Sequence, residues 1–202
     1  MDRPAKRIAA LQGATSHELQ GTLSAFAREL QSRGFRVAGV IEQSACGVRG
    51  ACKSLSVKDI ASGETIPISQ KLGAGSEACN LDPGGLAVAC GLVEQAIDRG
   101  VDVVVLSKFG KLEAARSGLC DAFRAAILAD IPVITAVSAP VSQDWDCFAG
   151  GLSEYVEPDI AALAAWWRAS HARKSCTQVM AAGASGIERA PRRPYLSAYG
   201  GA

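Results

Sequence analysis

The chain has 202 residues, of which 49% are hydrophobic and 5% aromatic. This composition suits one packed domain with a core of small and branched aliphatic side chains. The 21 Lys and Arg residues nearly balance the 20 Asp and Glu residues, so the formal net charge is +1. Such a balance gives no overall field toward nucleic acid or an acidic membrane, so we expect neither as a partner.

The seven cysteines show neither a CxxC pair nor a zinc-finger spacing. We therefore expect reduced thiols, as in the cytoplasm, and no metal site. The first apolar run, Ile8–Leu11, is too short for a signal-peptide core or a membrane span. The sequence thus predicts a cytoplasmic protein without a membrane segment.

The amino-terminal part predicts a βαβ opening. Its apolar residues predict a buried strand over Arg7–Leu11, followed by the polar loop Gln12–His17. A helix is expected to about Ser32, because apolar residues recur there at intervals of three and four. Gly34 then stops the helix, and Phe35–Ile41 predicts the second strand.

An antiparallel insertion is expected next. The segments Lys53–Ile60 and Thr65–Gln70 flank a short turn whose residues are typical of a β-hairpin. The loop that follows ends at Asp82, the expected cap of a helix from Pro83 to about Gly100.

The central part repeats a strand, loop and helix rhythm. Val101–Leu106 is apolar and β-branched, which predicts a central parallel strand. The loop Ser107–Glu113, a helix over Arg116–Leu128 and a strand over Ile131–Val137 follow. In such folds, ligand loops lie at the carboxyl ends of the strands.

Two further helices are expected, over Gln143–Phe148 and Pro158–Arg173, and they complete a domain that spans residues 7–173. From Lys174 onward the chain has few large apolar residues and many Gly, Ala, Ser, Pro and Arg residues. Burial of so little apolar surface cannot offset the entropy of ordering, so residues 174–202 are expected to form a flexible tail.

Two loops should meet at one sheet edge, where a helix amino end offers N–H groups and lysines offer charge to an anion. The candidate ligand-binding residues of these loops are Gly13, Thr15, Ser16, Ser107, Lys108 and Lys111. Ser76 and Cys79 join them from a glycine-containing loop that allows close backbone approach. In the alternative interpretation, Lys108 pairs with Glu113 or a neighbouring carboxylate and only closes its own loop.

The residues for phosphoryl transfer are missing. A hydrolytic P-loop needs GxxxxGK[ST], in which lysine meets the phosphates and a hydroxyl holds magnesium. Gln12–Leu23 contains no lysine. We therefore assign no catalytic residue.

The stretch Val103–Glu113, followed by Gly118–Phe123, resembles the Walker B region of the small P-loop nucleoside-triphosphatases. Gly34–Val40 and the hairpin around Ser62–Glu64 stand where that family has its second strand and its hairpin. The resemblance implies a P-loop-like three-layer α/β fold, with a mostly parallel sheet and an antiparallel hairpin insertion.

More specifically, the chain is similar to an uncharacterised bacterial family with this layout that is often encoded near molybdenum-transport genes. The stretches that carry the similarity are Ser76–Pro83 and Lys108–Lys111 with Glu113, within residues 7–170. Hydrolytic relatives have Asp-Glu at the end of the Walker B strand, whereas this chain has Ser107 and Lys108.

The sequence thus predicts a non-hydrolytic protein that binds a small anion. The resemblance implies an oxyanion such as molybdate or tungstate, or the phosphates of a nucleotide. Two alternatives stay open: a slow nucleoside-triphosphatase with lysines in unconventional positions, and an adaptor that binds another protein through the hairpin or the tail. Assembly into a homo-oligomer stays open as well.

Overall fold

The computed structural model describes residues 6–46, 52–69 and 81–171. The described residues up to Ser170 belong to one compact unit. Its strands are β1 (Ile8–Leu11), β2 (Val37–Cys46), β3 (Cys52–Asp59), β4 (Thr65–Pro67), β5 (Val103–Phe109), β6 (Val133–Val137) and β7 (Ser153–Val156). Its helices are α1 (Ser16–Ser32), α2 (Pro83–Asp98), α3 (Lys111–Ala114), α4 (Cys120–Leu128) and α5 (Ser142–Ala149), with residues 160–171 also helical.

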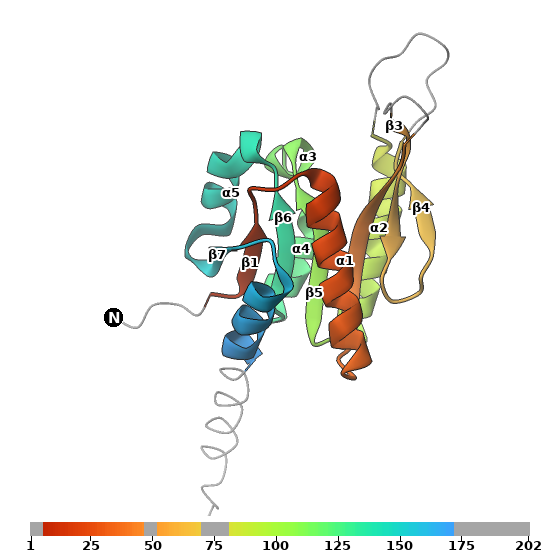
Figure 1. The fold of residues 1–202 in the computed structure, drawn as a ribbon. Coiled ribbons are helices and arrows are strands. Elements are labelled where there is room, and N and C mark those ends of the chain that lie inside the picture. The colour runs from red at the N-terminus through yellow and green to blue at the C-terminus, as the bar shows by residue number, and fades with distance from the viewer. Residues whose placement is uncertain (1–5, 47–51, 70–80, 172–202) are drawn as a thin grey trace, which may run out of the picture. The chain divides into compact units, whose positions relative to one another are not determined.

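The strands form one sheet in the order β4-β3-β2-β5-β6-β1-β7 (Figure 1). Strands β2, β5, β6, β1 and β7 run parallel, whereas β3 and β4 are antiparallel to their neighbours. The predicted α/β class, with a mostly parallel sheet and a hairpin insertion, is confirmed. None of the described helices has the length and apolar character needed to span a membrane.

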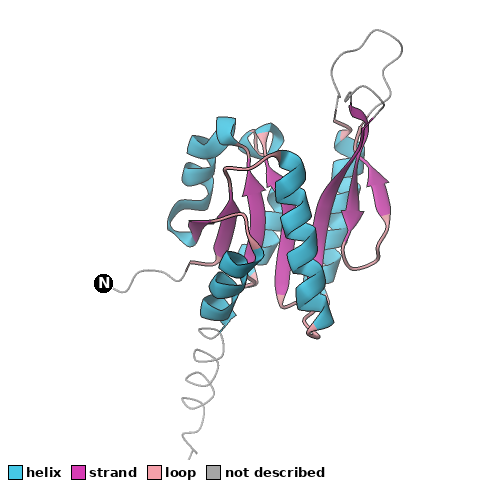
Figure 2. Ribbon diagram, viewed as in Figure 1, coloured by secondary structure: helices cyan, strands magenta, loops and turns pink. Residues whose placement is uncertain are grey.

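Helices cover both faces of the sheet, which gives three layers (Figure 2). Side chains of α1 and of the helix at 160–171 pack on one face, around Ala9 and Leu11 of β1. Those of α2, α4 and α5 pack on the other face, around Ile8 and Ala10. Successive β1 residues thus point to opposite layers, and all four are buried, as expected for a strand inside a parallel sheet.

Strand β5 is longer than predicted, because its last residue is an aromatic core residue. Phe109 is fully buried and stacks edge-on against Phe123 and Trp145. Ser107 and Lys108 therefore lie within β5, and α3 follows almost at once. The prediction of a loop over residues 107–113 was wrong, because the strand was expected to end at Leu106, the last aliphatic residue of the run.

Two other boundaries differ from the sequence prediction. Helix α4 begins at Cys120 instead of Arg116, because Arg116 and Gly118 both have positive φ, at 61° and 64°. Strand β7 was not predicted at all. It is short and half-exposed, and it pairs with β1 alone.

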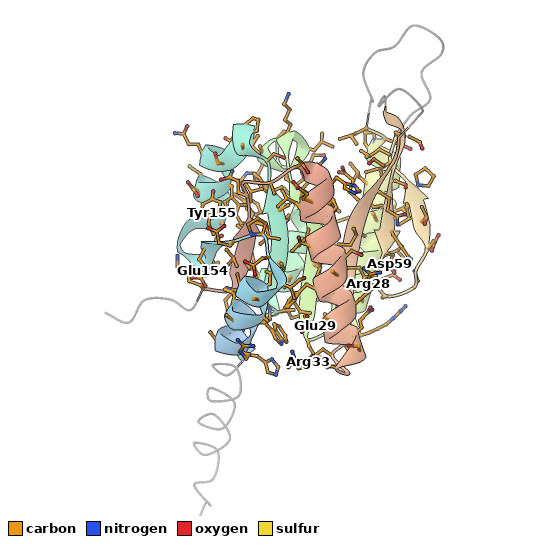
Figure 3. The ribbon with its side chains drawn as sticks, viewed as in Figure 1. Arg28, Glu29, Arg33, Asp59, Glu154 and Tyr155 are labelled. Carbon is orange, nitrogen blue, oxygen red and sulfur yellow. The ribbon has the colours of Figure 1, made fainter. Side chains whose placement is uncertain are left out.

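The two edge strands of the sheet are short. β4 has three residues and ends in Pro67, which has no N–H to donate. β7 has four residues, including Glu154 and the half-exposed Tyr155 (Figure 3). The Tyr155 hydroxyl donates a hydrogen bond to Asp146 of α5 at 3.2 Å.

Glu113 joins the start of α3 to the start of α4. Its carboxylate is buried and accepts hydrogen bonds from the backbone N–H of Gly110 at 2.9 Å and of Leu119 at 3.0 Å. A Cβ at Gly118 would lie 2.1 Å from Glu113 Oε1. The carboxylate therefore fixes the turn between these helices, and the turn leaves no space for a side chain at Gly118.

Close packing of β2 against β5 requires a glycine. Gly39 of β2 stands opposite Val105 of β5 with a φ of 128°. A Cβ at this position would lie 1.8 Å from the carbonyl oxygen of Val105. No side chain fits there without separating the two central strands.

We expect Gly39→Ala to lower the free energy of unfolding by at least about 3 kcal/mol, because both the backbone conformation and the contact become unfavourable. Gly21→Ala is the matched control, since Gly21 lies inside α1 with open space around its Cβ position. That control should gain about 0.5 to 1 kcal/mol. Urea unfolding measures both values, and equal stability of the two variants would contradict the packing argument.

For Glu113→Gln we expect a loss of about 2 to 3 kcal/mol, because an amide nitrogen would face a backbone N–H donor and leave it unsatisfied. Glu64→Gln removes one negative charge from the exposed hairpin turn and serves as the control. It should change stability by less than about 0.5 kcal/mol. Thermal and urea unfolding of both variants decide the question, and an unaffected Glu113→Gln protein would assign Glu113 no such role.

Candidate functional site

The carboxyl ends of β1, β5 and β6 meet at one edge of the sheet (Figure 1). A cavity of about 210 Å³ lies at this edge. Three segments line it: the loop between β1 and α1 with the first turns of α1, the end of β5, and the end of β6 with the residues that follow it. Its polar lining residues are Gln12, Gly13, Ser16, Gln20, Lys108 and Ser138. The structure thus brings together Gly13, Ser16 and Lys108 from the predicted set.

The start of α1 is closed by its own side chains. Thr15 is the N-cap, and its backbone N–H and hydroxyl both donate to Glu18 Oε2, at 2.8 and 2.7 Å. In return, the backbone N–H of Glu18 donates to the Thr15 hydroxyl at 3.3 Å. Thr15 is therefore engaged in a capping box and does not line the cavity.

Glu18 places a carboxylate at the helix end that was predicted to attract an anion. The hydrogen bonds from the hydroxyl and then from the backbone of Thr15 lower the pKa of Glu18. The carboxylate therefore stays ionised at neutral pH. Ser16 and His17 are the first residues of α1, and N–H groups at such positions have no acceptor within the helix.

Lys108 forms an ion pair with a carboxylate that the sequence analysis did not name. Its Nζ lies 2.6 Å from Oε2 of Glu42, on the neighbouring strand β2. The side chain of Lys108 is 33% exposed and that of Glu42 only 10%. Lys108 thus pairs with a neighbouring carboxylate, as one of the two interpretations expected, and still lines the cavity.

A buried amide holds this ion pair in place. Gln20 of α1 donates from Nε2 to the carbonyl oxygen of Ser107 at 2.6 Å. Its Oε1 accepts a hydrogen bond from the backbone N–H of Glu42 at 2.9 Å. One side chain of α1 therefore contacts both strands of the ion pair. It contacts β5 at Ser107, the residue before Lys108, and β2 at Glu42 itself.

The other predicted residues lie elsewhere. Ser107 is buried and, together with Lys111, lines a second cavity of about 70 Å³ beside Glu113, which Lys108 and Glu42 also line. Lys111 is exposed at the first turn of α3. Ser76 and Cys79 lie outside the described residues.

Sequence reasoning missed Ser138, Gln20 and Glu42. Ser138 directly follows β6, so the rule that ligands meet strand carboxyl ends was sufficient to find it. Gln20 is a polar residue next to the apolar face of α1, and nothing in the helical pattern names its partners. Glu42 was missed because β2 was expected to end at Ile41.

Burial disfavours the thiolate form of the cysteines in α2 and α4. Burial raises the pKa of Cys90, and burial together with the nearby Glu113 carboxylate raises that of Cys120 to about 11. The thiolate is the form that attacks electrophiles and binds metals, so these cysteines act as core residues. In the part of the chain that the structure describes, no three His, Cys, Asp or Glu residues form a group able to hold a metal ion.

Comparison with known proteins shows that the chain matches a segment of a longer protein. The chain is 36% identical over 167 residues to the molybdenum import ATP-binding protein ModC 2 of Bradyrhizobium diazoefficiens. This match covers 83% of the chain but 19% of that protein, so the chain spans about a fifth of its curated relative.

A likeness to a solved structure is weaker. THEP1 from the hyperthermophile Aquifex aeolicus shares 16% identity at a TM-score of 0.49, over 75% of this chain and 88% of that one. A family model matches residues 8–166, well over half of the chain. The chain therefore belongs to the family described as protein of unknown function (DUF2478), and the resemblance to an uncharacterised family is confirmed.

Proposed function

We propose that this domain binds a small oxyanion without hydrolysing a nucleotide, in the cavity lined by Gly13, Ser16, Lys108 and Ser138. The observation that carries the proposal is the position of Lys108. Lys108 lines a cavity that the first turn of α1 also lines. No other lysine or arginine lines this cavity among the described residues.

The donors match the chemistry of an oxyanion. Lys108 supplies an ammonium donor that it shares with Glu42, and Ser16 and Ser138 supply hydroxyl donors from two segments of the lining. The backbone N–H groups at the start of α1 add the partial positive charge of a helix amino end. Gly13 has a φ of 93°, so the loop takes a left-handed conformation that favours glycine.

Size favours a small anion over a whole nucleotide. Pockets for drug-sized ligands enclose roughly 300 to 1,000 Å³. The cavity of about 210 Å³ is smaller. A tetrahedral oxyanion fits such a volume, whereas a whole nucleotide would have to extend beyond it, for example into the hollow of about 600 Å³ that shares Ser16 and Gln20 with this cavity.

The name of the Bradyrhizobium relative guides the choice of ligands for a binding test. That protein is called a molybdenum import ATP-binding protein, although the matched segment is 19% of its length. Molybdate and tungstate are therefore the first anions to test, with sulfate and phosphate as tetrahedral competitors. ATP is included because the same name mentions it.

We expect no appreciable magnesium-dependent hydrolysis of ATP or GTP. The first loop has no lysine, and Ser107 and Lys108 occupy β5 where hydrolytic relatives carry acidic residues. Charge stabilisation and metal binding are the main terms in phosphoryl transfer. A phosphate-release assay should stay far below about 1 turnover per second, the lower end for ordinary enzymes. Turnover at that rate which disappears in Lys108→Ala would establish the alternative enzymatic function.

Lys108→Ala should weaken binding of the best anion by about tenfold or more, the scale of a hydrogen bond to a charged group. Lys111→Ala is the matched control, because it removes the same charge three residues away without touching the cavity lining. It should change affinity by less than about twofold, as expected for a screened surface charge. Isothermal titration of the three proteins with molybdate, tungstate, sulfate and phosphate measures this. Equal affinities would place the anion elsewhere.

A further inference from the structure

We propose that Glu42 determines which anions the cavity accepts, by disfavouring dianions relative to monoanions of the same shape. This inference rests on the proposed oxyanion site and names its specificity-determining residue. Its starting point is that Lys108, the one cation bordering the cavity among the described residues, is already paired. A bound anion must share that ammonium group with Glu42.

The distances keep Glu42 close to any anion that contacts Lys108. An anion oxygen accepts a hydrogen bond from an ammonium nitrogen at about 2.8 Å. Glu42 Oε2 lies 2.6 Å from the same nitrogen. The two oxygens are then at most roughly 5.5 Å apart, well inside the Debye length at physiological salt.

Glu42 has little freedom to move away. Its side chain is 10% exposed, so it cannot turn freely into solvent. Its backbone N–H donates to Gln20, whose other end holds the carbonyl of Ser107. These contacts fix the backbone on both sides of the ion pair, so the carboxylate stays beside Lys108 when the cavity is filled.

The local charges explain the expected selectivity. Glu42 neutralises Lys108, and Glu18 adds a further carboxylate at the start of α1. The remaining donors in the cavity are uncharged N–H and hydroxyl groups. Repulsion from Glu42 grows in proportion to the charge of the anion, so a dianion experiences twice the free-energy penalty of a monoanion at the same position.

The test compares molybdate with perrhenate, two tetrahedral anions of similar size that differ in charge. Glu42→Gln keeps the shape of the side chain and an oxygen that accepts from Lys108, while it removes the charge. We expect this variant to bind molybdate about tenfold more tightly and perrhenate about threefold more tightly than the unmodified protein. Isothermal titration at pH 8 and physiological salt gives both ratios.

Glu29→Gln is the matched control. Glu29 lies in α1 13 residues beyond Ser16, toward the carboxyl end of the helix (Figure 3). At a rise of 1.5 Å per residue this places it about 20 Å from the helix start, where screening removes its influence. Its substitution should leave both affinities unchanged. Thermal unfolding without anion checks that each variant folds.

Each outcome has a defined meaning. Equal gains for both anions in Glu42→Gln would show rearrangement of the cavity and not a charge effect, and would overturn the inference. Unchanged affinities would overturn it as well, while the oxyanion site itself would stand. Failure of every protein to bind either anion would overturn the proposed function together with this inference. Binding of molybdate by Glu42→Gln alone, with perrhenate bound by the unmodified protein, would support both.

Discussion

The arrangement at the carboxyl edge of the sheet depends on the side-chain amide of Gln20. A buried amide is costly unless its donor and its acceptor are both satisfied. Here the two partners are backbone groups of two different strands, so α1 satisfies its amide only in one position relative to β2 and β5. The interaction therefore sets the position of α1 relative to the strands that carry Glu42 and Lys108. Replacement by an apolar residue would leave a carbonyl and an N–H without partners.

Two carboxylates near this edge have different roles because their partners differ. Glu113 accepts only from backbone N–H groups and joins two short helices, so it is not available to a lysine. Glu42 pairs with Lys108 beside a cavity. The first contact stabilises the fold, and the second adjusts the charge of the candidate site. Separation along the chain alone would favour a pair between Lys108 and Glu113, because Glu113 is far nearer than Glu42 to Lys108 in the sequence.

The sequence predicted the class of the fold and most of its elements, because these follow from local patterns. Hydrophobic periodicity predicted the end of α1 at Ser32, where the helix ends. The predicted cap at Asp82 is confirmed, because its carboxylate accepts a hydrogen bond from the Gly84 N–H at 3.0 Å. Glycine and hydroxyl content also directed attention to Gly13 and Ser16. The pairing of Lys108 with Glu42 could not be predicted in this way, since it depends on β2 and β5 being neighbours in the sheet. Strand β7 was missed because four half-exposed residues give no clear alternation.

The short edges of the sheet have a consequence for contacts with other chains. Exposed strand edges recruit other strands, and proteins prevent this with short edge strands, prolines and charged residues. β4 ends in Pro67, and β7 carries Glu154 over a length of only four residues. Both edge strands therefore offer few free backbone N–H and carbonyl groups to a strand of another chain.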